Sequence, residues 1–117
     1  MPAPNIVNVA TITGKTAVQA IGTSATAIVT NSAGSNKVLK VNALYVANVD
    51  GTTAADLTVD LFRSSTAYRL ASTISVPSDA TLDVISKAIY LEEGDSLRLT
   101  ASAAGDLQAV CSYEEIS

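Results

Sequence analysis

The sequence predicts an all-β protein: a single-domain antiparallel β-sandwich, jelly-roll-like, with a short extended N-terminal arm. Two observations lead to this prediction. Apolar and polar residues alternate with a period of two along most of the chain, which is typical of strands with one face on a core and the other in water. Turn signals rich in Gly, Asp, Asn and Pro separate these runs, and the links are too short for the helical crossovers that parallel strands require.

The alternation is clearest in residues 56–61, 95–101 and 107–113, where every second side chain is apolar. Asp50 and Gly51 lie between two such runs and predict a hairpin turn. Residues 67–72 leave one helical turn open as an alternative to a strand. We predict strands over residues 6–13, 16–21, 25–30, 38–49, 56–63, 68–76, 81–91, 96–102 and 107–114.

The length of 117 residues predicts one domain, 1–117, that buries roughly two-thirds of its unfolded surface without a disulfide. Residues 1–8 contain Pro2 and Pro4 and are expected to form an extended arm, with a mobile terminus as the alternative. The first residues have neither a basic region nor an apolar run, so we expect no signal peptide. No apolar stretch is long enough to cross a membrane, so we expect no membrane partner.

The composition argues against most chemistry. The chain has no histidine, no tryptophan and a single cysteine, which excludes the usual triads and makes zinc binding improbable. We therefore predict no enzyme, no cofactor and no metal. The net charge is −4 and the basic residues are scattered, so we expect no direct binding of nucleic acid. Cys111 is predicted to be a small buried apolar residue rather than a reactive thiol.

Several carboxylates are candidate sites. Glu92, Glu93 and Asp95 cluster at one turn, and Glu114 and Glu115 lie near the end of the chain. We expect all five to be exposed and solvated, because charged turn residues are seldom buried. The oxygen-rich residues 50–56 offer a calcium site as the alternative to a plain hairpin turn, although they lack the ligand spacing of a dedicated calcium loop.

Residues 38–49 are apolar on both faces of the predicted strand, and residues 6–13 behave similarly. Such a strand is either covered twice or leaves an apolar patch. One interpretation is that a loop or a neighbouring strand covers the second side. The other is a subunit interface, for which the candidates are Val7, Val9, Val38, Leu44 and Val46.

Three segments resemble parts of a known group of proteins. Residues 44–61, LYVANVDGTTAADLTVDL, resemble a strand–turn–strand of small virion structural proteins of tailed bacteriophages. Residues 89–102, IYLEEGDSLRLTAS, are similar to another of their hairpins. The closing residues 112–117, SYEEIS, resemble the C-terminus of such proteins from phages of marine cyanobacteria. The resemblance extends from residue 38 to the end of the chain.

The resemblance implies a capsid decoration or cement protein on the virion surface that binds the major capsid protein or other virion proteins. It implies a homo-oligomer, with a trimer favoured, and it carries over no catalytic residue. A place at the neck, tail or fibre base is an alternative. A host-surface or carbohydrate-binding module is another, although only 4% of the residues are aromatic, which is few for stacking on sugars.

Overall fold

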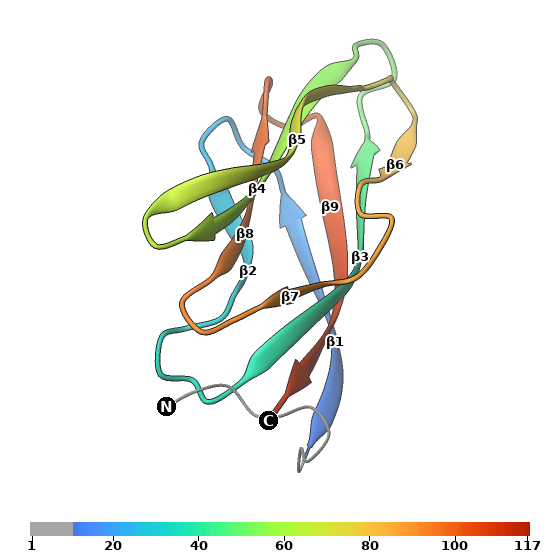
Figure 1. Cartoon of the computed structure of the whole chain (residues 1–117). Helices are drawn as coiled ribbons and strands as arrows, with labels where there is room; N and C mark the ends of the chain where they lie inside the picture. Colours follow the sequence, from blue (N-terminus) through green and yellow to red (C-terminus); the bar gives the residue numbers. More distant parts are fainter. Residues whose placement is uncertain (1–10) are drawn as a thin grey trace.

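The computed structural model describes residues 11–117, which form nine β-strands in two facing layers (Figure 1). β-branched residues and alternating polarity run through most of these segments, as half-buried strands require. The strands are β1 (Ile12–Ala20), β2 (Thr26–Thr30), β3 (Val38–Asn48), β4 (Ala55–Arg63), β5 (Thr66–Val76), β6 (Thr81–Asp83), β7 (Ile89–Leu91), β8 (Ser96–Ala101) and β9 (Leu107–Ile116).

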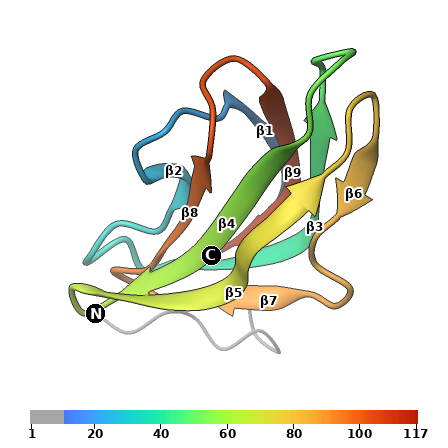
Figure 2. The same ribbon diagram turned by 90° about the horizontal axis from the view of Figure 1, so that it is seen from above.

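The strands are paired in a nested order. Sheet A has the order β1-β9-β3-β6, with β7 also pairing with β3, and sheet B has the order β2-β8-β4-β5. The first strand therefore pairs with the last, the second with the one before the last, β3 with β7 and β6, and β4 with β5. All of these pairs are antiparallel. This arrangement is a jelly roll, which confirms the predicted fold class, and Figure 2 shows the two layers from above.

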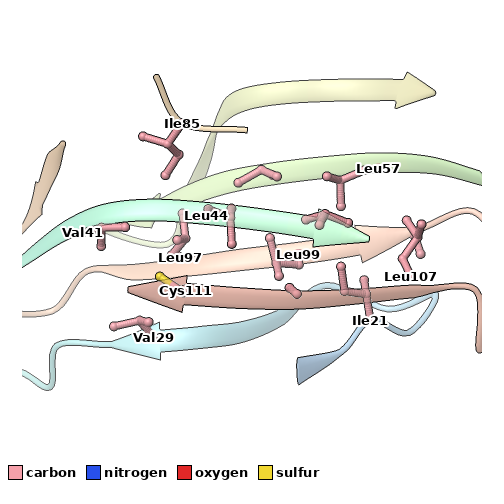
Figure 3. Packing of buried hydrophobic residues seen from close by; sticks show 14 of the residues in the cluster. Ile21, Val29, Val41, Leu44, Leu57, Ile85, Leu97, Leu99, Leu107 and Cys111 are labelled. Atoms are coloured by element: carbon pink, nitrogen blue, oxygen red, sulfur yellow. The ribbon is translucent and has the colours of Figure 1, made fainter. Parts of the chain in front are cut away.

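The core lies between the two sheets (Figure 3). Leu44 of β3 in sheet A and Leu57 of β4 and Leu99 of β8 in sheet B are fully buried there. Cys111 of β9 is also buried in this cluster, and the lack of water around its thiol raises the pKa of Cys111 to about 11. The prediction that Cys111 is a buried apolar residue is confirmed.

Two strand predictions differ from the structure. Residues 81–91 form two three-residue strands, β6 and β7, rather than one. Between them the chain leaves the ladder, because Ile85 is buried in the core cluster while the amide of Val84 donates to the carbonyl of Leu44 at 2.9 Å. β1 runs without a break through Gly14, where one predicted strand ends and the next begins. Residues 67–72 belong to β5, so the predicted strand is confirmed over the alternative of a helical turn. The predicted arm, 1–8, lies outside the described residues.

The turn at Asp50 and Gly51 is not a hairpin, because β3 belongs to sheet A and β4 to sheet B. The connection instead crosses between the sheets. The buried carboxamide of Asn48 holds it by donating to the carbonyls of Thr53 and Val76, each at 2.9 Å. The Asp-Gly pair is common in tight turns of several kinds. Here the pairing of β3 and β4 with strands of different sheets decides the path of the chain.

The connection from β2 to β3 crosses the sandwich in the opposite direction and has a similar clamp. Asn31 is buried, and its Nδ2 donates to the carbonyls of Lys37 and Leu91, each at 2.9 Å. These two crossovers therefore each contain one buried asparagine whose carboxamide donates to two backbone carbonyls, as buried polar groups require partners.

The proposed interface on β3 is wrong, because its residues are buried within the chain. Val38, Leu44 and Val46 are 7%, 0% and 0% exposed. The reason is a β-bulge: Val41 pairs with Tyr113 and residue 43 with Ser112, which leaves Asn42 as an inserted residue. The insertion shifts the alternation by one residue, so apolar side chains on both sides of it face the core. Val38 is buried beside its cross-strand partner Ile116. Val7 and Val9 lie outside the described residues.

Candidate functional site

The outer face of sheet A carries three exposed apolar side chains in one line across the sheet. Val18 of β1 pairs with Val110 of β9, and Val110 pairs with Tyr45 of β3. Their exposed fractions are 74%, 43% and 45%. Directly opposed side chains of this kind lie about 5 Å apart at Cβ. We call these three residues the apolar row.

The local sequence explains why the row points outward. On β9, Ala109 and Cys111 are buried, so Val110 between them faces solvent. On β3, Leu44 and Val46 are buried, so the bulge places Tyr45 on the outer face. Apolar side chains thus occupy positions that alternating strands normally give to polar residues.

A shallow depression of about 340 Å³ lies at the β1–β9 end of the apolar row. The end of the row at β6 meets Asp83, which pairs with Tyr45. The depression holds no nucleophile and no titratable side chain, so its chemistry is that of apolar contact. Its lining residues are Val18, Gln19, Ala20, Gln108, Ala109 and Val110.

The outer face of sheet B differs, because its large side chains contact one another. Nη1 of Arg69 donates to both carboxylate oxygens of Asp60 at 2.8 Å, and Asp60 is buried beneath it. The guanidinium of Arg98 lies 3.4 Å from the centre of the Phe62 ring, which is cation–π geometry. These partners leave the centre of this face without an apolar row.

Asp95 is buried and paired, so the prediction that it is solvated is wrong. It is 2% exposed, and it accepts from Nε and Nη2 of Arg63 at 2.8 and 2.6 Å and from the amide of Glu92 at 2.8 Å. Burial alone would raise the pKa of Asp95, but these hydrogen bonds outweigh it and hold the pKa below its ordinary value. The same contacts raise the pKa of Arg63. This cluster clamps β4 to the β7–β8 turn.

The other carboxylates have structural partners or remain in solvent. Glu115 joins Lys37 and Lys15 at 2.8 and 3.2 Å, and these lysines hold the pKa of Glu115 below its ordinary value. Glu93 accepts from the amide of Asn36 at 3.0 Å. Glu92 bonds to Arg63 but stays mostly exposed, as predicted for this residue.

The alternative of a calcium site in residues 50–56 gains no support from the geometry. Oδ1 of Asp50 accepts from the amide and the hydroxyl of Thr52, each at 2.9 Å, and these bonds lower the pKa of Asp50. Across residues 11–117 no three metal-ligating side chains come together. The same part of the chain contains no helix long and apolar enough to span a membrane.

The sequence contains one signal for the apolar row, which is an apolar residue at an outward position of a predicted strand. Val110 stands between Gln108 and Ser112 at the outward positions of an alternating run, where a polar residue is normal. For Tyr45 no such signal was available, because the bulge at Asn42 cannot be located from the pattern alone.

No protein-family model matches the chain, and no curated protein matches it. Among solved structures, the fold is similar to a chain from Bacillus endospore appendages, which are described there as "a novel family of disulfide-linked pili". The similarity has a TM-score of 0.52 at 15% sequence identity and covers 92% of this chain and 88% of that chain. At this identity the similarity concerns the fold.

Proposed function

We propose that this chain is a non-enzymatic structural subunit of a virion, a capsid decoration or cement protein that binds the outer shell. The observation that carries the proposal is the apolar row. Val18, Val110 and Tyr45 hold apolar area in water on one sheet face, while the opposite outer face pairs its own side chains. Exposed apolar area of this kind is typical of contact surfaces.

Two further observations support an assembly role. The sequences of residues 44–61 and 89–102 resemble segments of phage virion proteins. One structural neighbour comes from endospore appendages that are described as disulfide-linked pili. Here the single cysteine is fully buried, so this chain would assemble through non-covalent contacts.

The mechanism we propose is passive. Apolar area that leaves water on contact contributes about 25 cal/mol per Å², and the ordering and association costs reduce this gain. One apolar row therefore gives a weak contact. On a particle surface many copies bind at once, and the effective affinity rises through multivalency.

The first test is the copy number of the protein relative to the major capsid protein, measured by quantitative mass spectrometry of purified virions. A number comparable to that of the major capsid protein is expected for decoration or cement. A much smaller number would move the protein to the neck, tail or fibre base, and absence from particles would overturn the virion proposal.

The second test separates the row from general surface hydrophobicity. The variant Tyr45→Lys/Val110→Lys should keep its fold and lose particle binding. The matched control is Tyr68→Lys/Leu70→Lys on β5 of sheet B, where two equally large apolar side chains are 56% and 44% exposed. Normal binding by the row variant, or equal loss in both variants, would remove the row as the contact.

One observation favours a second candidate, a carbohydrate-binding or host-surface module. A depression of about 160 Å³ on sheet B is lined mainly by hydroxyl and carboxylate groups, which suit hydrogen bonding to sugars. Saturable binding on a glycan array, lost in Thr58→Val/Thr100→Val, would support this candidate. The lining residues are Asp56, Thr58, Thr73, Thr100, Ala101 and Ser102.

A further inference from the structure

β1 is an edge strand whose second edge has no partner within residues 11–117, where it pairs with β9 alone. Proteins usually protect such edges with prolines, bulges or outward charges. β1 has no proline and no bulge over its nine residues. Its one charged residue, Lys15, forms an ion pair with Glu115 inside the chain.

The opposite edge of the sandwich shows the protection that β1 lacks. The register between β5 and β4 shifts twice, and Thr73 of β5 has a left-handed backbone with φ of 46°. These features twist the edge of β5, so β1 is the more open template for another strand.

The hydrogen-bond pattern shows which groups of β1 are free. Thr11 and Ser117 exchange both backbone bonds, at 3.0 and 2.9 Å, and the amide of Ile21 donates to Leu107 at 2.9 Å. Bonded and non-bonded pairs alternate along an antiparallel ladder. The odd-numbered residues of β1 therefore bond to β9. The even-numbered residues direct their N–H and C=O groups to the open edge, and these are Ile12, Gly14, Thr16, Val18 and Ala20.

The same even-numbered residues form a self-complementary series about Thr16. If a second copy of β1 runs antiparallel with Thr16 opposite Thr16, Gly14 falls opposite Val18 and Ile12 opposite Ala20. The two exposed large side chains of the strand, Ile12 at 58% and Val18 at 74%, then each meet one of its smallest residues. Every free N–H and C=O group in the strand also finds a partner.

Two neighbouring registers also pair even-numbered residues with each other, but their side-chain pairs are less favourable. Centring the pair on Lys15 places two lysines directly opposite one another, which is unfavourable, and sets Ile12 against Val18. Centring it on Ala17 leaves Ile12 without a partner and shortens the ladder. The register centred on Thr16 is the one that pairs the whole strand.

We propose that two copies of this chain associate through antiparallel pairing of β1 with β1 about a two-fold axis at Thr16, which joins their A sheets into one continuous sheet. Such an isologous contact closes at two copies. It rests on the geometry of β1 and does not depend on a place in a virion. A trimer, which the sequence resemblance implies, would need a different contact.

The first test is sedimentation velocity of the full chain from low to high micromolar concentration. A reversible dimer is expected for the natural sequence. Thr16→Pro should be monomeric, because it removes an N–H that points to the open edge and leaves every bond to β9 in place. A monomeric or trimeric natural chain, or a dimer unaffected by Thr16→Pro, would overturn the proposal.

A charge exchange tests the register and does not depend on whether the proline variant folds. Gly14→Lys/Val18→Lys places like charges opposite one another at two symmetric positions and should weaken the dimer by about tenfold or more. Gly14→Glu/Val18→Lys should restore it. A Cβ at Gly14 meets no atom within 4 Å, so both variants fit the fold of one chain. Equal dimerisation of the two variants would contradict the register.

A cross-link gives a third measurement on the same axis. Thr16→Cys should form a covalent dimer under mild oxidation, since the Cα atoms of a directly opposed bonded pair lie about 5.5 Å apart. Thr13→Cys is the matched control on the same strand, because in this register Thr13 faces Gln19. The natural Cys111 is fully buried and should stay reduced. Equal cross-linking at positions 13 and 16 would exclude the proposed axis.

Discussion

The two outer faces of this sandwich differ in how their side chains are satisfied. On sheet B, Asp60 is buried beneath Arg69 and the guanidinium of Arg98 covers the ring of Phe62. On sheet A, Val18, Val110 and Tyr45 project into water in one row. A face whose side chains pair with one another needs no partner. Covering an apolar row with another surface is favourable, because it removes apolar area from water. This difference makes the outer face of sheet A the candidate contact surface.

The largest effect should come from the inner side of the same strand that carries Tyr45. Leu44→Ala removes a fully buried side chain and should lower the free energy of unfolding by about 2–5 kcal/mol. Tyr45→Ala, one residue further along, should change it far less. Urea unfolding of both variants measures the difference. Similar losses would mean that the row is covered within one chain.

The second effect concerns the buried clamp at Asp95. Asp95→Ala removes the acceptor for Arg63 and for the amide of Glu92 and should cost about 1–3 kcal/mol in the free energy of unfolding. Glu92→Ala is the control, because the side chain of Glu92 is 67% exposed and should matter little. Thermal unfolding of the two variants gives the comparison, and equal stability would contradict the clamp.

The clamp also predicts a sensitivity to acid. The native pKa values of Asp95 and Glu115 lie below their ordinary values of 3.8 and 4.5, so the folded state holds the ionised carboxylates more tightly than the unfolded state does. Their contribution is complete above those ordinary values and is lost as the pH falls through the lower native values. Between about pH 5 and pH 2, the natural chain should lose more stability than Asp95→Asn.

A smaller loss is expected on the outer face of sheet B. Arg69→Gln breaks the ion pair with Asp60, but the arginine side chain is 58% exposed and water screens part of the interaction. The free energy of unfolding should fall by about 1 kcal/mol. Lys87→Gln, an exposed position outside the strands, is a charge-matched control. A gain in stability would show that the ion pair between Arg69 and Asp60 does not stabilise the fold.

The smallest change in stability should come from the apolar row itself. Val110→Thr keeps a β-branched residue on the outer face of β9 and should alter the free energy of unfolding by less than about 0.5 kcal/mol. Retention on a hydrophobic interaction column should fall more clearly. Val29→Thr is the control for burial, since Val29 is 4% exposed and should be destabilising.

Most of the fold was predictable, because alternation depends on local residues. The runs at 96–101 and 107–113 give strands whose buried faces agree with the pattern, and short links favour antiparallel sheets. The strand order cannot be predicted from any single segment, because it depends on pairing between distant segments. An Asp-Gly pair is common in tight turns, but the connection that contains Asp50 and Gly51 leads from β3 in sheet A to β4 in sheet B.

The site was harder to predict, because one inserted residue decides it. Without the bulge at Asn42, a strand with apolar residues on both faces exposes one of the two. With it, Leu44 and Val46 turn inward and Tyr45 turns outward. The burial of Asp95 depends on Arg63, which is 32 residues away in the sequence, and no local pattern links them.

The most direct test of the central claim is tyrosine-specific chemical labelling of the assembled protein compared with the free chain. Tyr45 of sheet A and Tyr68 of sheet B are 45% and 56% exposed, so both should react in the free chain. In the assembly, we expect Tyr45 to be protected while Tyr68 still reacts. Protection of Tyr68 with Tyr45 still reactive would contradict a contact on sheet A and place it at the β4–β5 hairpin, where Tyr68 pairs with Leu61.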